Sequence, residues 1–378
     1  MKILLHIRSL DVGGSERQVI SLAKAMAEIG VEVDVALIRV GGSLAIDLAN
    51  IVGIHIYEVG KPGLRGRITY LIRLRSLIKN GNYDAVYGFL PTPNLALLVA
   101  LSIRNRPLIA WGIRSSGLDL SQYGPKVKWT MRIEKWLSRF PDKIFTNSQA
   151  GLQEYRAAGY PHTKLHHIPN AIDVKRFKPN PSARNLVRRE LGIPDSASLI
   201  GLFARIHPMK DHLTFLRAVK IMIIRRPDVR FICAGGGSPE YSTYEALLKS
   251  TIDDLGIDGC VYWLGPRNDP ETLMAACDVT TLTSNNGEGF PNCVAESMAC
   301  GVPCIPTDIG DSSNIVRNFV QVIPPNNPEV LAKAWEATLD QDQAKKRQLS
   351  IQIRESIIER FSSSNIAETV ITDLGVRA

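Results

Sequence analysis

The sequence predicts a doubly wound α/β protein made of two Rossmann-like units. Strand-like runs alternate with helix-like runs along the whole chain, which is the pattern of parallel-sheet α/β folds. Most of the strand-like runs are continuously apolar, as expected for strands covered on both faces. The chain has 378 residues, about twice the usual domain length of ~100–200 residues. We therefore expect two units facing a central cleft.

Six strands are expected in each half of the chain. Those of the first half are Ile3–Ile7, Val33–Ile38, Ala85–Phe89, Leu108–Trp111, Lys143–Asn147 and Leu165–Ile168. Those of the second half are Leu199–Ala204, Arg230–Ala234, Val261–Leu264, Val279–Thr283, Val302–Pro306 and Val320–Ile323. The alternation breaks near Asp173 to Ser198 and then restarts. We expect domains at 1–175 and 176–357, with a C-terminal helix at about 358–378 packing back on the first domain.

Composition is that of a globular protein, with 45% hydrophobic and 22% charged residues. The longest apolar run, Leu95–Ile103, is far shorter than the ~20 residues of a membrane span. The opening M-K-I-L-L-H-I is too short for a signal-peptide core and is typical of a first strand. None of the six cysteines form a C-x-x-C pair, which predicts buried thiols in a reducing compartment. We expect a cytoplasmic protein, free or peripheral on the inner face of the cytoplasmic membrane.

The positive charge lies in the first half. Residues 1–178 carry 25 Lys/Arg against 13 Asp/Glu, a balance of +12, and residues 179–378 carry 20 against 24, a balance of −4. Between Glu58 and Asp84 there are six basic residues and no acid, namely Lys61, Arg65, Arg67, Arg73, Arg75 and Lys79.

A second basic cluster spans Lys126 to Lys143, where apolar side chains share one helical face. That face holds Trp129, Ile133, Trp136, Leu137 and Phe140, with Lys128, Arg132, Lys135 and Arg139 around it. Either the aromatic stripe packs on the sheet below solvated charges, or it docks on an anionic bilayer. Nucleic acid is not expected as a partner, because no nucleic-acid-binding motif is present.

The most informative segment is E-G-F-P-N-C-V-A-E-S-M-A-C-G-V-P, from Glu288 to Pro303. Glu288 lies in a Gly/Asn-rich turn after an apolar run, and Glu296 lies in a short helix that Pro291 can open and Gly301 can close. A strand follows at once. The loop and the helix start are therefore expected at the carboxyl edge of a parallel sheet, where such folds bind ligands. Two acids there suit a ligand rich in hydroxyl groups, since a carboxylate accepts several hydrogen bonds.

Three other strands end in residues suited to a nucleotide. Arg205 and Lys210 follow one strand and precede a helix, a placement that suits a diphosphate. Gly235 and Gly236 end the next strand and allow close backbone approach, or only a turn. The segment from Gly265 to Arg267 ends another, where a nucleobase could lie against the backbone.

The first strand is followed by Gly13, Gly14 and Ser15 before a helix with an apolar stripe. The glycines permit backbone contact with an anion, or form only a tight turn. The pattern is not G-x-G-x-x-G, and no acid supports a dinucleotide site. A nicotinamide-dependent oxidoreductase is therefore disfavoured.

The chain resembles the retaining glycosyltransferases of family 4 (glycosyl transferases group 1), which have the GT-B fold. The motifs that carry the resemblance follow the family's order over nearly the whole chain: G-G-S-E-R, N-S-Q-A-G, H-H-I-P-N-A-I-D, A-R-I-H-P-M-K-D-H, the G-G-G turn, W-L-G-P-R and E-G-F-P-N-C-V-A-E-S-M-A-C-G-V-P-C. The resemblance implies transfer of a sugar from a UDP- or GDP-sugar to a saccharide or lipid-linked acceptor, with retention, in polysaccharide, lipopolysaccharide or glycolipid synthesis.

The resemblance also implies a role for each site residue. Arg205 and Lys210 hold the diphosphate and stabilise the leaving group. The sugar is bound by Glu288 together with the backbone at Gly289, Phe290, Pro291 and Asn292, and the ribose is bound by Glu296. The nucleotide is bordered by Gly235, Gly236, Gly265 and Arg267, while the donor phosphate and the acceptor are faced by Gly13, Gly14 and Ser15. No cofactor and no metal are expected. A metal ion on a donor diphosphate would be held by an Asp-x-Asp beside the site, and here the two cations Arg205 and Lys210 take the place of that metal.

The chain departs from the family at three positions, one of them near Phe319, where a glycine common before the I-P-P segment is missing. Where many relatives carry a His near the reacting sugar, this chain has Ala110 to Ser116, and Arg114 is expected to take that place. Where relatives show P-N-G, this chain has Pro169-Asn170-Ala171, and alanine tolerates a positive φ poorly. Two alternatives remain: Glu288 as a covalent nucleophile, and a catalytically degenerate protein that binds nucleotide sugars without turnover.

Overall fold

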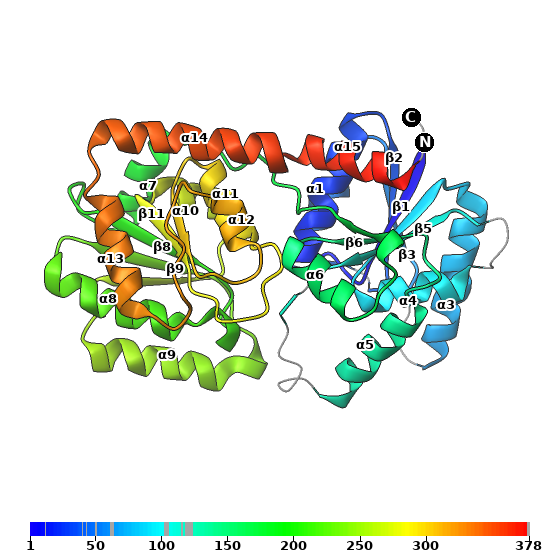
Figure 1. The fold of residues 1–378 in the computed structure, drawn as a ribbon, viewed down its shortest axis with the longest axis horizontal. Coiled ribbons are helices and arrows are strands. Elements are labelled where there is room, and N and C mark those ends of the chain that lie inside the picture. Colours follow the sequence, from blue (N-terminus) through cyan, green and yellow to red (C-terminus); the bar gives the residue numbers. More distant parts are fainter. Residues whose placement is uncertain are drawn as a thin grey trace. The chain divides into compact units, whose positions relative to one another are not determined.

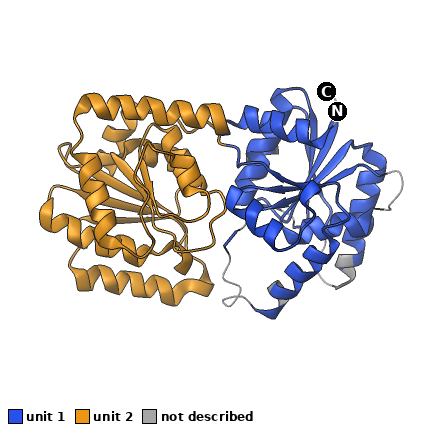
Figure 2. Cartoon of the chain, viewed as in Figure 1, with its two compact units in different colours: residues 1–171, 361–378 blue, residues 172–360 orange. Residues whose placement is uncertain are grey.

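The computed structural model describes residues 1–378 except 12, 40, 43, 50, 61–63, 102–105, 115, 118–123 and 376–378. The chain forms two compact units, shown in different colours in Figure 2. Unit 1 consists of Met1–Ala171 and Phe361–Ala378, and unit 2 consists of Ile172–Arg360. The boundaries expected from the sequence, at 175/176 and 357/358, lie within a few residues of these.

Unit 1 is built on a seven-stranded parallel sheet in the order β3-β2-β1-β4-β5-β6-β7. Its strands are β1 (Lys2–Ile7), β2 (Glu32–Leu37), β3 (Ile54–Glu58), β4 (Ala85–Phe89), β5 (Leu108–Ile113), β6 (Lys143–Thr146) and β7 (Leu165–His167). The strand order reverses between β1 and β4, which makes their carboxyl ends the topological switch point of the sheet. The edge strand β3 was not expected from the sequence.

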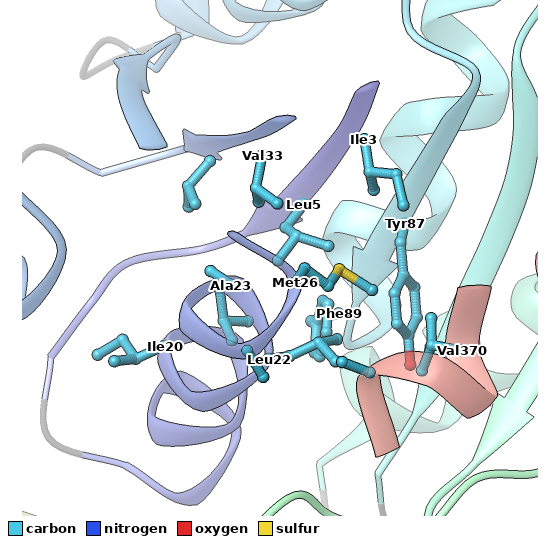
Figure 3. Close-up of a cluster of buried hydrophobic side chains, with 14 of the residues drawn as sticks. Ile3, Leu5, Ile20, Leu22, Ala23, Met26, Val33, Tyr87, Phe89 and Val370 are labelled. Atoms are coloured by element: carbon cyan, nitrogen blue, oxygen red, sulfur yellow. The ribbon is translucent and has the colours of Figure 1, made fainter. Parts of the chain in front are cut away.

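Helices cover both faces of this sheet: α1 (Gly14–Glu28), α2 (Ile46–Ala49), α3 (Leu64–Gly81), α4 (Pro91–Ala100), α5 (Pro125–Leu137), α6 (Gln149–Ala157) and α15 (Ser363–Leu374). A short 3₁₀ turn, η2 (His162–Lys164), precedes β7. Figure 3 shows one core, in which Leu22 and Met26 of α1 meet Leu5 and Tyr87 of the sheet, with Val370 of α15 beside Tyr87. The C-terminal helix thus completes the core of unit 1. The opposite face of the sheet is packed against α3 and α4 through Leu74 and Leu97, among others.

Unit 2 is built on a five-stranded parallel sheet in the order β10-β9-β8-β11-β12. Its strands are β8 (Leu199–Phe203), β9 (Arg230–Ala234), β10 (Val261–Gly265), β11 (Val279–Leu282) and β12 (Cys304–Pro306). The expected strand Val320–Ile323 is wrong, because this segment makes only an isolated bridge between Ile323 and Thr307.

The helices of unit 2 are α7 (Pro181–Leu191), α8 (His212–Arg225), α9 (Ser242–Leu255), α10 (Pro270–Ala276), α11 (Asn292–Ala299), α12 (Ser312–Val316), α13 (Pro328–Leu339) and α14 (Gln343–Phe361), as labelled where space allows in Figure 1. Two 3₁₀ turns, η3 (Pro208–Lys210) and η4 (Pro239–Tyr241), follow β8 and β9. Phe215 of α8, Phe231 of β9 and Trp335 of α13 pack ring to ring in the core, 5.5 to 6.0 Å between centroids. The C-terminal helix expected at about 358–378 corresponds to the end of α14 and to α15, which are separated at Ser362.

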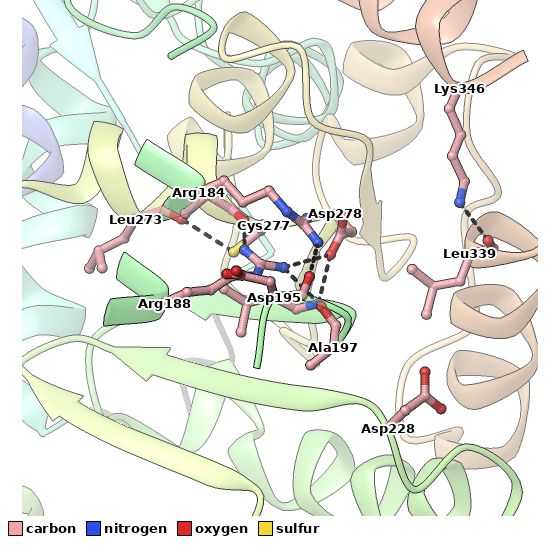
Figure 4. A network of polar contacts seen from close by, with 12 residues as sticks. Arg184, Arg188, Asp195, Ala197, Asp228, Leu273, Cys277, Asp278, Leu339 and Lys346 are labelled. Carbon is pink, nitrogen blue, oxygen red and sulfur yellow. Dashed lines mark hydrogen bonds and ion pairs between the residues drawn. The ribbon is translucent and has the colours of Figure 1, made fainter. Parts of the chain in front are cut away.

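An arginine–aspartate network holds the amino end of the second sheet together (Figure 4). Arg188 of α7 is 1% exposed and donates to the carbonyl oxygens of Ala197 (2.9 Å) and Ala276 (3.2 Å). Asp278, at the start of β11, accepts from the backbone N–H of Leu199 (2.8 Å) and pairs with Arg184 (2.8 Å). Because β8 and β11 are fixed at their amino ends, the loops at their carboxyl ends begin from defined positions.

Among the described residues, no helix combines the length and the apolar character needed to cross a bilayer. All six cysteines are free thiols, and all but Cys293 are buried, as expected for small apolar core residues. The structure contradicts the interpretation that the aromatic stripe of residues 126–143 packs on the sheet. Trp129, Ile133, Trp136 and Phe140 are all exposed. Lys61 and the side chains of Arg65, Arg67 and Lys126 lie outside the described part.

Candidate active site

The carboxyl edge of the sheet in unit 2 collects the predicted donor residues. All five strands are parallel, so the loops that follow them emerge at one edge. The central strand β8 lies between β9 and β11. The loops after these three strands are therefore neighbours, and they carry the Arg205/Lys210 segment, the glycines from Gly235, and Glu288.

The turn after β8 is shaped by local side-chain hydrogen bonds. His207 caps η3, because its Nδ1 accepts from the backbone N–H of Met209 at 3.1 Å. Asp211 has a left-handed backbone (φ 45°) and caps α8 by accepting from the N–H (3.2 Å) and Oγ1 (2.6 Å) of Thr214. The caps fix Lys210 between the end of η3 and the start of α8.

Two hydrogen bonds tie this turn to the loop after β11. Thr283 Oγ1 donates to the carbonyl oxygen of Lys210 at 2.8 Å, and the N–H of Asn285 donates to that of Met209 at 2.9 Å. The loops of two neighbouring strands therefore form one connected framework around Lys210.

Within that framework, the predicted cation and the predicted acid form an ion pair. Lys210 Nζ donates to Glu288 Oε1, which also accepts from Ser284 Oγ. The side chains of Lys210 and Glu288 are 15% and 8% exposed. A mostly buried charge pair of this kind is tightly positioned, because either charge alone would be poorly solvated there.

The backbone at Glu288 and Gly289 is supported by the loop after β12. Gly310 has φ +60°, and a Cβ at this position would lie 2.5 Å from the carbonyl oxygens of both Glu288 and Gly289. The N–H of Asp311 donates to the carbonyl oxygen of Gly289 at 2.9 Å. Only glycine allows this approach, so Gly310 is a site residue that the sequence reasoning missed. The only indication of this role in the sequence is a single glycine that follows a buried strand.

The second acid, Glu296, is on α11, which begins after Pro291 and ends before the left-handed Gly301 (φ +76°), as the sequence predicted. Cys293, one turn earlier, shows which charges gather here. The residue as a whole is only partly buried, but desolvation of its thiol raises the pKa well above its usual range. Cys304, Glu288 and Glu296 raise it further, while Lys210 opposes them. Lys210, Glu288 and Glu296 therefore all act electrostatically on this one thiol.

Arg205, the other predicted cation, lies on the opposite side of His207 in the sequence. Its side chain is exposed, and Nη2 lies 3.6 Å from Sδ of Met209. Burial lowers the pKa of His207, and the charges of Arg205 and Lys210 lower it further. Both cations therefore act on the same imidazole, whose ring centroid is 4.3 Å from that of Tyr241. His207 stood in the predicted motif but was given no role.

The glycines after β9 and β10 border a pocket of about 470 Å³. Gly235 and Gly265 line it together with Trp263 and Pro266, among others. A Cβ on Gly235 would lie 1.9 Å from the carbonyl oxygen of Ala204, whereas a Cβ on Gly236 would meet only Cβ of Pro266, at 3.6 Å. Gly265 has φ +64°. Glycine at 235 therefore lets the backbone at the end of β9 lie directly against the backbone at the end of β8.

Arg267 follows this edge, but its guanidinium is held by two acids. It donates to Asp269 (2.8 Å from both Nε and Nη2) and to Glu190 (Nη2, 3.2 Å). These hydrogen bonds raise the pKa of Arg267 further. Its side chain is not among the groups that line the pocket.

The sequence does contain one Asp-x-Asp triplet, Asp340-Gln341-Asp342. It connects α13 to α14, where Asp340 pairs with Arg226 (2.8 Å) and Asp342 accepts from the N–H of Lys345 (2.8 Å). The two aspartates of the triplet therefore stabilise the connection between α13 and α14. Across the described ranges, no three His, Cys, Asp or Glu side chains converge as a metal site would require.

The other predicted residues, Gly13, Gly14, Ser15 and Arg114, are in unit 1. Gly13 is the N-cap of α1 with an extended backbone, and a Cβ there would lie 2.1 Å from Glu16 Oε2. The Glu16 carboxyl group thus lies against the start of α1. Burial raises its pKa, as does the charge of Asp11. Glu16, in the third position of the helix, is a further residue that the sequence reasoning left without a role.

Arg114 follows β5 and contacts side chains from two other strands' ends. It donates from Nη1 to Asn170 Oδ1 (2.5 Å) and from Nη2 to the hydroxyl of Tyr87 (2.9 Å), and its guanidinium lies 4.6 Å from the ring centroid of Phe89. Ala171 does not adopt a positive φ. Its N–H and carbonyl oxygen are instead both bound by Gln18 of α1, at 2.6 and 2.9 Å.

Comparison with known proteins places each unit. Residues 183–356 match the family described as "Glycosyl transferases group 1", and residues 12–176 match "Glycosyltransferase Family 4". The D-inositol 3-phosphate glycosyltransferase of Thermobispora bispora is 26% identical over 358 residues, 87% of this chain and 81% of that protein. The UDP-Gal:alpha-D-GlcNAc-diphosphoundecaprenol alpha-1,3-galactosyltransferase of Escherichia coli is 26% identical over 258 residues, 66% of this chain and 64% of that protein.

Among solved structures, Anabaena Alr3699/HepE in complex with UDP and glucose has a TM-score of 0.85 and 23% identity, with both chains fully covered. That likeness shows the fold. The two matched families together span most of the chain, and both sheets are parallel and doubly wound. The chain therefore belongs to the GT-B glycosyltransferases of group 1 and is a glycosyltransferase that uses nucleotide sugars.

Proposed function

We propose that this protein transfers a sugar from a UDP- or GDP-sugar to a saccharide or lipid-linked acceptor, with retention of the anomeric configuration and without a metal. The observation that carries the proposal is the ion pair between Lys210 and Glu288 in unit 2. It joins a cation suited to the leaving diphosphate with an acid suited to the sugar, at the carboxyl edge of a parallel sheet.

The two cations act on the leaving group. Breaking the bond between the sugar and the diphosphate develops negative charge on the diphosphate. Arg205 and Lys210 follow the central strand β8, and both lower the pKa of His207, so the potential at this turn is positive. Groups that are fixed before the reaction stabilise such charge by about 3 kcal/mol each. Lys210 is fixed by Glu288 and by the two hydrogen bonds that hold its backbone turn.

The two acids and the start of α11 hold the donor's hydroxyl groups. Glu288 accepts from Lys210 and Ser284 through Oε1, and a carboxylate has further acceptor positions for sugar hydroxyls. The backbone from Gly289 to Asn292 leads into the N-terminus of α11, where N–H groups point outward. Glu296, inside the same helix, is assigned to the ribose.

The pocket beside Gly235 and Gly265 is assigned to the base. Its volume of about 470 Å³ lies in the range of small-ligand sites, and Trp263 and Pro266 supply flat apolar contact. Two known proteins support the donor class. HepE binds UDP and glucose, and a relative in Corynebacterium glutamicum is named a GDP-mannose-dependent mannosyltransferase.

Retention follows, on this proposal, from attack on the same face of the sugar, with the donor phosphate accepting the acceptor's proton. Glu288 is less suited to act as a covalent nucleophile, because Lys210 and Ser284 both bind its Oε1. The degenerate alternative is not favoured, since both cations and both acids of the motif are present in one site.

The acceptor is assigned to unit 1, where Gly13 to Ser15 and Arg114 lie at the carboxyl edge of the sheet. A relative that acts on a diphosphoundecaprenol-linked sugar supports a lipid-linked acceptor. With the excess of basic residues in the first half, we place the enzyme at the cytoplasmic face of an anionic membrane.

A donor screen tests the proposal. Nucleoside diphosphate sugars should raise the melting temperature of the full chain by mass action, with one base preferred, and the shift should persist in EDTA. Proton NMR of the transfer product should show the donor's anomeric configuration. Equal shifts for every nucleotide would contradict a base pocket, an inverted product would contradict retention, and loss of transfer in EDTA would contradict metal independence.

A further inference from the structure

The helix α5 packs on unit 1 through its polar side. Glu134 is 2% exposed and accepts from Asn94 Nδ2 of α4 at 3.1 Å. Burial raises the pKa of Glu134 to about 7. Ser138, one turn later, is also buried, and Leu137 is partly buried against the neighbouring core. The inward face of α5 is thus defined by a buried acid and its amide partner.

The outward face of α5 is aromatic. Trp129, Ile133 and Trp136 follow one another at intervals of four and three residues, which places them on one side of α5, and Phe140 follows just after the helix ends at Leu137. Their exposed fractions are 61%, 45%, 62% and 44%. A surface helix of a soluble domain normally turns such residues inward. An exposed row of large apolar side chains therefore indicates an interaction surface.

This surface, Trp129/Ile133/Trp136/Phe140, is surrounded by positive charge. Lys128, Arg132, Lys135 and Arg139 are all exposed. The guanidinium of Arg132 lies 5.7 Å from the ring centroid of Trp129, and that of Arg139 lies 5.2 Å from that of Trp136. Between Gly124 and Phe140 the only acid is Glu134, which points inward.

We propose that the outward face of α5 docks on the interface of an anionic lipid bilayer, with the tryptophans at the level of the headgroups and the basic side chains on the lipid phosphates. Tryptophan prefers the boundary between headgroups and acyl chains, and basic residues beside it are attracted to anionic lipid. A second copy of the chain is a poorer occupant, because it would bring two positive rims together. This inference rests on the proposed function, since a lipid-linked acceptor lies in a membrane.

Flotation of the full chain with vesicles tests the docking surface. Vesicles of phosphatidylcholine with phosphatidylglycerol should bind the protein, and phosphatidylcholine alone should bind it much more weakly. Replacing both tryptophans, Trp129→Ala with Trp136→Ala, should lower the partition coefficient at least about tenfold. Arg132→Gln with Arg139→Gln should lower it about fivefold for each charge, and added salt should weaken binding of the native chain.

A matched control uses exposed apolar residues of unit 2. Leu186 and Ile224 are 58% and 74% exposed, and Leu186→Ala with Ile224→Ala should leave vesicle binding unchanged. Quenching of tryptophan fluorescence by lipids brominated on the acyl chain should occur in the native chain and be lost in the double tryptophan variant, because Trp111 and Trp335 are buried and Trp263 is partly buried in the core of unit 2.

Three results would overturn the inference: no flotation with anionic vesicles at low salt, equal flotation of the tryptophan variant, or a native dimer that becomes monomeric in that variant. Donor binding, measured on the same proteins without vesicles, separates the two proposals. Donor binding without vesicle binding contradicts only the docking surface, whereas vesicle binding without donor binding contradicts only the proposed transferase chemistry.

Discussion

The carboxyl edges of the two sheets differ in how their charged groups are used. In unit 2, Lys210 and Glu288 come from different loops and form a mostly buried ion pair, and both act with Glu296 on the thiol of Cys293. In unit 1, Arg114 contacts Tyr87, Asn170 and Phe89 of its own unit, and Glu16 lies against the N-terminus of α1. The comparison teaches that similar architecture supports a mostly buried ion pair between two loops on one sheet, and an arginine bound to neutral side chains at the edge of the other. Donor affinity should therefore depend on unit 2, and transfer on both.

The largest expected effect is on the chemistry in unit 2. Lys210→Ala should lower kcat at least 100-fold, about 3 kcal/mol, because a fixed cation beside the leaving diphosphate is lost. Arg217→Ala, on an exposed position of the helix α8 that follows Lys210, is the matched control and should transfer at the native rate. Steady-state transfer assays measure both.

Lys210→Ala also leaves the buried Glu288 without its cation, which destabilises the fold. The double variant Lys210→Ala with Glu288→Gln separates the two effects: its melting temperature should recover, and its transfer rate should not. Recovery of transfer in the double variant would show that Lys210 acts only as a structural partner.

The next largest effect is a loss of stability at low pH, to which one buried histidine in each unit should contribute. Burial lowers the pKa of His6 in unit 1 and of His212 in unit 2 to about 4 each. The unfolded chain binds protons from about pH 6.5 downward while the folded chain does not, so stability is full above pH 6.5 and is lost as the pH falls toward 4. At pH 5 each histidine should lower the free energy of unfolding by about 2 kcal/mol relative to its value above pH 6.5.

Urea unfolding at pH 7 and pH 5 measures this loss. His6→Gln and His212→Gln should each lower the free energy of unfolding at pH 7. Between pH 7 and pH 5, however, the free energy of unfolding should fall less in each variant than in the native chain. If both variants lose as much as the native chain, the acid sensitivity belongs to other groups.

A smaller effect is expected on donor affinity. Glu296→Gln removes the charge of an acceptor assigned to the ribose, and should raise the Kd of the nucleoside diphosphate about tenfold, 1.4 kcal/mol, with less change in kcat. Glu355→Gln, exposed on α14, serves as control. Calorimetric titration that gave the native Kd for Glu296→Gln would remove the ribose assignment.

The smallest effect sharpens the role of unit 1. Arg114→Lys cannot contact Asn170, Tyr87 and the Phe89 ring at once, and should lower stability by about 1 kcal/mol. Donor Kd should stay at its native value, while transfer to the acceptor should fall. Arg73→Lys, exposed on α3, should change neither quantity. A weaker donor Kd in Arg114→Lys would mean that this edge also binds the donor.

Much of the fold followed from local pattern because parallel strands buried on both faces are continuously apolar. The pattern failed at β3, where Ile54 to Glu58 reads I-H-I-Y-E and is largely exposed, since an edge strand is covered less. It also failed at Val320–Ile323, an apolar run that pairs through one residue. Neither outcome is decided by the segment itself; both depend on which neighbours the chain brings alongside.

In the site, too, the local motif was predicted but the contacts between distant residues were not. The motif of Glu288 to Pro303 placed both acids and the helix between Pro291 and Gly301. Nothing in it revealed the contact between Glu288 and Lys210, 78 positions apart, or the need for glycine at 310. For α5 the spacing indicated an apolar face, but the direction of that face was set by the pairing of Glu134 with Asn94, which links residues 40 positions apart.

The place of α15 has a consequence for synthesis of the chain on the ribosome. Ile366, Ala367, Val370 and Leu374 are buried in the core of unit 1 against α1, although they are translated after all of unit 2. Unit 1 is started first and completed last, so a strip of α1 stays uncovered while some 190 residues of unit 2 emerge. Nascent chains halted before residue 361 should hold unit 1 in an incompletely folded, chaperone-accessible form.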